Sequence, residues 1–74
     1  MIPNMKSTQD AWKFGENATE EQVELMKRVR NVCLNQFENL FEAEDDSDEI
    51  LNLMSEIATQ SQYMREAIEM SNHQ

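Results

Sequence analysis

The sequence has little of what small proteins use to build disulfides, metal centres and phosphate loops. Its 74 residues include one cysteine, one glycine and one proline. A single cysteine forms no disulfide within the chain, and one Cys with one His cannot supply a four-ligand zinc site. The one glycine leaves no glycine-rich phosphate loop, and no motif of a hydrolase or metalloprotease is present. We therefore expect no enzymatic activity, no cofactor and no metal.

Basic residues and long apolar runs are also scarce. Six Lys and Arg stand against 15 Asp and Glu, so the net charge is −9 and the isoelectric point is about 4.3. This balance argues against a duplex nucleic acid as partner, because such binding needs clustered cations. Apolar runs are too short to cross a bilayer, and the N-terminus does not have the layout of a signal peptide. The sequence predicts a cytoplasmic protein that makes no membrane contact.

The residues that are present predict a single all-α domain. With strand-type alternation nearly absent, we expect a short N-terminal helix in segment 1–17, a helix over 19–42, an acidic turn over 43–47 and a helix over 48–71. Ser7 is the expected cap of the first helix, and Gly15 is its expected end, in the left-handed conformation. Thr19 to Gln22 form a capping box.

Both long segments carry apolar residues at alternating spacings of three and four, which predicts an antiparallel two-helix hairpin. If the chain reverses at the acidic turn, positions whose numbers sum to 90 or 91 face each other. Two polar positions, Arg30 and Ser61, then coincide. The expected apolar pairs are Phe41 with Ile50, Phe37 with Met54, Cys33 with Ile57, Met26 with Met64, and Val23 with Ile68.

Further apolar residues lie outside these two seams, and a hairpin cannot bury a second stripe alone. A chain this short also buries a small core. We therefore expect a homo-oligomer, in which contacts between copies cover the surplus. The residues concerned are Leu25, Val29, Val32, Leu51, Leu53 and Tyr63.

Basic residues gather near the middle of the expected hairpin, where Lys27, Arg28 and Arg30 come level with Arg65. Arg30 has two interpretations. It is either a specificity device within a packed seam, where it reaches solvent or pairs with a carboxylate of a neighbouring subunit, or an anion or base contact in a positive pocket.

An aromatic-basic-aromatic stretch comes before the first long helix. Trp12 and Phe14 flank Lys13, and two roles are open for the aromatic rings. They either fill the end of the hairpin or a neighbour's groove, or form a platform for a nucleobase with Lys13 near its phosphate.

Taken together, these segments resemble a family of phage proteins, the small helical anti-CBASS sponges that sequester cyclic oligonucleotide signals. The likeness covers about residues 12 to 72. It lies in Phe14-Gly15, Thr19-Glu20-Glu21-Gln22, Val29-Arg30, Ser47-Asp48-Glu49, Tyr63 and Ala67-Ile68.

The resemblance implies a compact homo-oligomer, often a hexamer, that binds cyclic di- or trinucleotides between protomers without cleaving them. It implies a place in the cytoplasm of an infected bacterial cell, as an inhibitor of immune signalling. Phe14 would stand where the family has a stacking tyrosine, with Thr19 and Arg30 as polar contacts. Asp48 departs from the family pattern by replacing a basic residue, and Gln60 and Arg65 depart from it on the last helix.

The acidic composition favours a different class of function. The run from Glu42 to Glu49 and the net charge of −9 are typical of an inhibitor that binds a basic protein, as a DNA mimic does. A coiled-coil assembly module without a ligand is a third interpretation.

Overall fold

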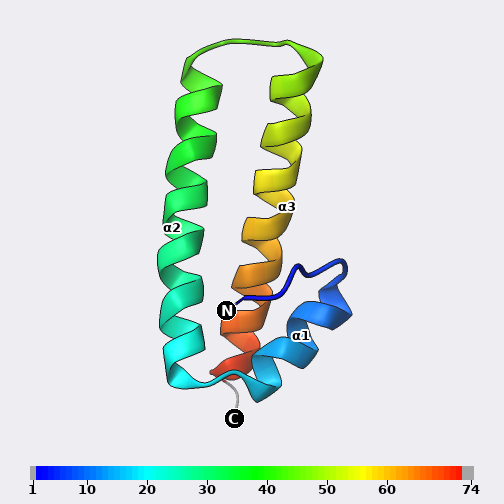
Figure 1. The fold of residues 1–74 in the computed structure, drawn as a ribbon, viewed down its shortest axis with the longest axis vertical. Coiled ribbons are helices and arrows are strands. Elements are labelled where there is room, and N and C mark those ends of the chain that lie inside the picture. The colour runs from blue at the N-terminus through cyan, green and yellow to red at the C-terminus, as the bar shows by residue number, and fades with distance from the viewer. Residues whose placement is uncertain (1, 73–74) are drawn as a thin grey trace.

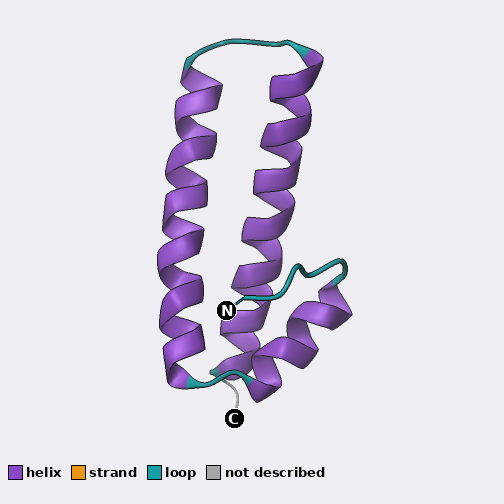
Figure 2. Cartoon of the chain, in the orientation of Figure 1, coloured by secondary structure: helices purple, strands orange, loops and turns teal. Residues whose placement is uncertain are grey.

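The protein, described here by a computed structural model over residues 2–72, consists of three helices: α1 (Thr8–Asn17), α2 (Glu20–Glu42) and α3 (Asp48–Ser71). Across residues 2–72 all regular structure is helical, and the connections are short (Figure 2). The expected all-α class is therefore confirmed. None of the described helices combines the length and the hydropathy needed to cross a membrane.

Each helix begins at a side-chain cap, and those of α1 and α2 are the caps that the sequence predicts. The Asp10 amide donates to Ser7 Oγ over 3.1 Å at the start of α1. Thr19 and Gln22 form the reciprocal capping box of α2, and the Ile50 amide donates to Ser47 Oγ over 3.4 Å at the start of α3. These bonds satisfy amides that would otherwise lack partners, and such a cap is generally worth about 1 kcal/mol.

Gly15 does not end the first helix, so that prediction is wrong. α1 continues to Asn17, and Gly15 is a buried helical residue with no left-handed backbone. An added Cβ at Gly15 would meet the backbone of Ala67, which lies 2.9 Å from that position at its Cα and closer still at its carbonyl oxygen. The glycine is present because α1 and α3 pack with their backbones in contact there.

The helix α3 lies between the other two helices. Both α1 and α2 pack against α3, and Figure 1 shows α2 and α3 side by side, joined at one end by the turn, with α1 against the far half of α3. Glu44 takes the left-handed conformation in this turn, with φ of 55°. The molecule is elongated, with extents of 41 × 20 × 19 Å.

The segment before α1 crosses α3 and is attached to it by two side chains. Gln60 Nε2 donates to the Met5 carbonyl over 3.0 Å, and the Tyr63 hydroxyl donates to the Lys6 carbonyl over 3.4 Å. Met5 is buried beneath this crossing. The segment thereby covers part of the apolar surface that lies outside the α2–α3 seam.

The main core cluster lies at the end of the molecule that α1 covers. Its buried members are Met5, Ala11, Met26, Met64 and Ala67. Ile57, 8% exposed, is a further buried residue of α3 toward the turn. Arg30 and Ser61 do meet across the seam, as the register predicts, with Arg30 Nε donating to the Ser61 carbonyl over 3.2 Å.

Toward the turn, the seam residues Phe37, Leu40, Ile50 and Met54 are half-buried rather than fully buried. The expected pairing of Phe41 with Ile50 is wrong, because the Phe41 side chain is 69% exposed. The preceding residue of α2, Leu40, is half-buried instead. A 100° step between successive helical residues separates these two positions, so only one of them can face α3.

Candidate anion-binding site

Three of the predicted basic residues converge on one hollow between α2 and α3. The hollow has a volume of about 220 Å³. It is lined by Lys27, Arg30 and Asn31 of α2 and by Arg65, Ile68 and Glu69 of α3. Spacings of three and four residues place Lys27, Arg30 and Asn31 on one face of α2. The shared hollow gathers half of the chain's six cations on a molecule of net charge −9.

Arg30 is held by a backbone group rather than by a carboxylate. Its Nε donates to the Ser61 carbonyl, and the side chain is half-buried in the seam. The bond occupies one of the five N–H donors of the guanidinium. Among residues 2–72 the other four donors have no protein partner. Arg30 thus has a fixed orientation and a full positive charge available to an anion.

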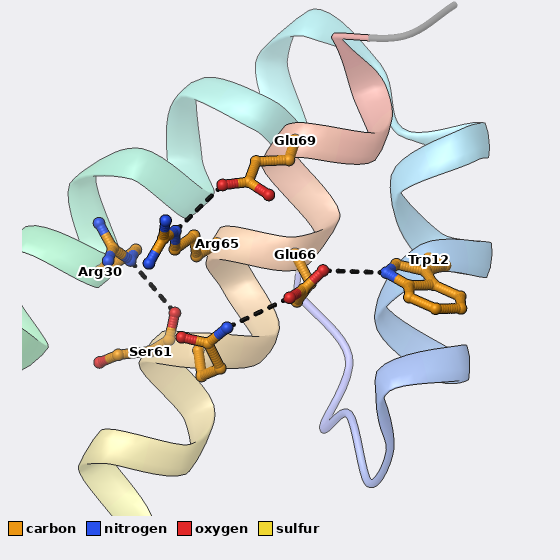
Figure 3. A network of polar contacts seen from close by, with 7 residues as sticks. Trp12, Arg30, Ser61, Arg65, Glu66 and Glu69 are labelled. Carbon is orange, nitrogen blue, oxygen red and sulfur yellow. Dashed lines mark hydrogen bonds and ion pairs between the residues drawn. The ribbon is translucent and has the colours of Figure 1, made fainter.

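The other two cations are paired with acidic residues of their own helices. Arg65 Nε lies 3.0 Å from Glu69 Oε1, and Lys27 Nζ lies 3.5 Å from Glu24 Oε1. Both pairs are about half-exposed, so water screens them. Figure 3 shows Arg65 beside Arg30, with Glu69 one helical turn further along α3.

Trp12 lies apart from the basic hollow. Its Nε1 donates to Glu66 Oε2 over 3.0 Å, and Gln62 Nε2 donates to the other oxygen of the same carboxylate over 3.2 Å. In Figure 3 this bridge joins α1 to one side of α3, while Arg30 and Arg65 lie on the other side. In a single chain, Trp12 therefore connects two helices and does not share a site with the cations.

Lys13 and Phe14 line a second hollow, of about 370 Å³, between α1 and the segment that precedes it. Phe14 is half-buried and packs against the core, which leaves part of its ring accessible. The remaining lining residues are Pro3, Asn4, Met5, Asp10 and Asn17. This hollow and the basic hollow have no residue in common, so one chain does not bring the aromatic ring and the three cations together.

Thr19 lies at a third position, as the cap of α2. Its hydroxyl accepts the Gln22 amide, so the oxygen already has a structural partner. Arg28 faces the same side as Thr19 and helps to line a hollow with several acidic residues of the first turn of α2. The fourth basic residue of the predicted cluster therefore points away from the other three.

The chemistry available in the basic hollow is the binding of an anion. Two guanidiniums, an ammonium and the Asn31 amide supply hydrogen-bond donors suited to phosphate or carboxylate oxygens. Within the described part of the chain, no group of three His, Cys, Asp or Glu side chains is placed to hold a metal ion. Sequence reasoning missed Asn31 and Glu69, although their spacing of four from Lys27 and Arg65 could have identified them.

Comparisons of this chain with protein-family models, curated proteins and solved structures find no match.

Proposed function

We propose that this chain is a non-enzymatic binding protein that sequesters cyclic di- or trinucleotides intact, the role implied by its resemblance to phage anti-CBASS sponges. The observation that carries the proposal is the convergence of Lys27, Arg30 and Arg65 on one hollow. Three cations that share one hollow repel one another, and of the three only Arg30 has no carboxylate partner among residues 2–72, so an added anion is stabilised there. A phosphodiester supplies that negative charge and accepts hydrogen bonds from the planar guanidinium.

The size of the hollow indicates how much of the ligand one chain contacts. Sites for small organic ligands usually measure about 300–1,000 Å³, whereas the basic hollow measures about 220 Å³. One chain therefore offers a subsite that fits a phosphate group. In the proposal, the bases extend beyond the hollow, and an aromatic ring such as Phe14 of another copy stacks on one of them.

The assembly in the proposal is a homo-oligomer of antiparallel hairpins. Its support is the apolar surface that the single chain leaves exposed, at Val32 in the middle of α2 (65%) and at Phe41 and Leu51 near the turn (69% and 49%). Burying such side chains between copies is favourable at about 25 cal/mol per Å² of apolar surface. A closed symmetric assembly would cover this surface and bring the α1 hollow of one copy near the basic hollow of the next.

The test is calorimetric titration of the purified protein with a panel of cyclic di- and trinucleotides. Arg30→Met should weaken binding by about tenfold or more, since a hydrogen bond to a charged group is worth about 1.5–3 kcal/mol. Its matched control is Arg28→Met, which removes the same charge outside the hollow and should bind as the parent does. Binding by none of the ligands to the folded protein, or equal loss in both variants, would contradict the proposal.

A second candidate function rests on the exposed acidic end of the molecule. All residues from Phe41 to Glu49 are exposed, and six of them are carboxylates: Glu42, Glu44, Asp45, Asp46, Asp48 and Glu49. This surface suits a basic protein as partner, with fast and salt-dependent association. Replacement of Asp45 and Asp46 by Lys should abolish such binding in low salt, and unchanged capture of the partner would count against this function.

A further inference from the structure

The cations of the basic hollow differ in what holds them, and this difference has a functional consequence. Arg30 is oriented by the Ser61 carbonyl, a neutral group. Arg65 donates through Nε to Glu69 Oε1, and Glu69 also lines the hollow. A carboxylate therefore stands at the position from which it can compete with an incoming anion for the Arg65 guanidinium.

We propose that Glu69 acts as an internal competitor of the ligand: its carboxylate pairs with Arg65 in the empty site and yields the guanidinium to a phosphate group on binding. This inference rests on the proposed function of the hollow as an anion site. Arg30 is then the constant anion contact, and Arg65 is a contact whose availability depends on Glu69. Glu69 would thus favour highly charged anions, because an anion of low charge competes poorly with its carboxylate for Arg65.

Breaking the Arg65–Glu69 pair costs little free energy. The pair is about half-exposed and spans four residues of one helix, where such ion pairs contribute little to stability. Arg precedes Glu in this pair, which is the less favourable order with respect to the helix dipole. A phosphate that also contacts Arg30 and Lys27 meets three cations at once, whereas Glu69 pairs with one. The ligand therefore displaces the carboxylate without disturbing either helix.

Glu69 also has an electrostatic effect on an anion in the hollow. Its charge repels phosphate whether or not it is paired with Arg65, and this repulsion weakens as salt is added. Replacing Glu69 by Gln keeps the size and the hydrogen-bonding oxygen but removes the charge. Phosphate affinity should rise about two- to tenfold, from the loss of both the pairing and the repulsion.

The experiment is an NMR titration of the full chain with inorganic pyrophosphate at low salt, following the Arg Nε–Hε signals. Glu69→Gln is compared with Glu38→Gln, which removes one charge from an exposed position of α2 outside the hollow. The expected result is tighter binding by Glu69→Gln alone, with the Arg65 signal shifted on titration in the parent. A circular dichroism melt of each variant establishes that the fold is retained.

The outcomes separate this inference from the proposed function. If the parent binds pyrophosphate and both variants bind it equally, the competitor role of Glu69 is wrong and the anion site stands. If pyrophosphate perturbs neither Arg30 nor Arg65, both the site and the role of Glu69 are overturned. If pyrophosphate binds as expected but cyclic dinucleotides do not, the role of Glu69 stands and the ligand class of the proposed function is wrong.

Discussion

The two ends of the molecule have similar sequence patterns and different degrees of burial. At the end covered by α1, Met26 is 0% exposed and Met64 is 4% exposed, whereas near the turn Phe41 is 69% exposed and Leu51 is 49% exposed. Both ends consist of two helices with apolar residues at alternating spacings of three and four. The difference is the third layer, because α1 and the segment before it enclose side chains that two helices alone leave in water.

The two functions proposed for the chain use opposite ends of the molecule. The covered end includes the basic hollow, where the Ser61 carbonyl orients Arg30 in the seam. The end near the turn, called the open end below, has exposed acidic and apolar side chains from Phe41 to Glu49 and at Leu51. We infer that stability comes mainly from the covered end and that contacts with other chains come mainly from the open end.

The largest expected effect comes from truncating the core at the covered end. Met26→Ala should lower the free energy of unfolding by about 2–5 kcal/mol, since it leaves a cavity among fully buried neighbours. Phe41→Ala, the matched change at the open end, should alter it by less than about 0.5 kcal/mol in the dilute monomer. Chemical denaturation followed by circular dichroism measures both. Equal losses in the two variants would remove the distinction between the ends.

A smaller effect is expected at the contact of α1 with α3. Gly15→Ala should destabilise the protein by about 1–3 kcal/mol, since the new methyl group would overlap the Ala67 backbone. The gain in helix propensity, about 1 kcal/mol, offsets part of this loss. Trp12 fluorescence reports the docking of α1 through its bond to Glu66. The exposed neighbour Lys13→Ala serves as the control, and an unchanged fluorescence melt for Gly15→Ala would contradict the close packing.

The smallest expected effect is a gain in stability at the middle of the seam. Among residues 2–72, Ser61 Oγ is a buried side-chain atom with no hydrogen-bond partner. Ser61→Ala should therefore raise the free energy of unfolding by about 1 kcal/mol, because an unsatisfied buried hydroxyl is costly. The Arg30 bond survives, since it uses the Ser61 carbonyl. Thermal melts compare Ser61→Ala with the control Ser55→Ala, which changes an exposed serine. A lower melting temperature for Ser61→Ala than for Ser55→Ala would contradict this expectation.

Local signals in the sequence predicted most of the fold. The caps at Ser7, Thr19 and Ser47 depend on neighbours three residues away, so they are legible without tertiary information. The meeting of Arg30 with Ser61 followed from the periodicity of the two long helices. The role of Gly15 is not predictable from local signals, because it depends on a contact with Ala67, 52 residues later.

The sequence predicts one part of the candidate site, the grouping of its cations. Helical spacing and register together bring Lys27, Arg30 and Arg65 into one hollow. The position of Trp12 could not be derived, because it depends on how α1 docks on α3 and on the partner that Glu66 provides. The separation of Phe14 from the cations likewise follows from the placement of α1, which the sequence pattern of α1 alone does not determine.

In the proposed function, this chain binds cyclic oligonucleotides intact through its basic hollow as part of an assembly of copies. Native mass spectrometry of the protein mixed with a panel of cyclic di- and trinucleotides tests it most directly, because one spectrum reports both the number of copies and the mass of the bound ligand. We predict a homo-oligomer that carries unmodified cyclic nucleotide and loses it in Arg30→Met. A folded monomer that binds none of these ligands would contradict the proposed function.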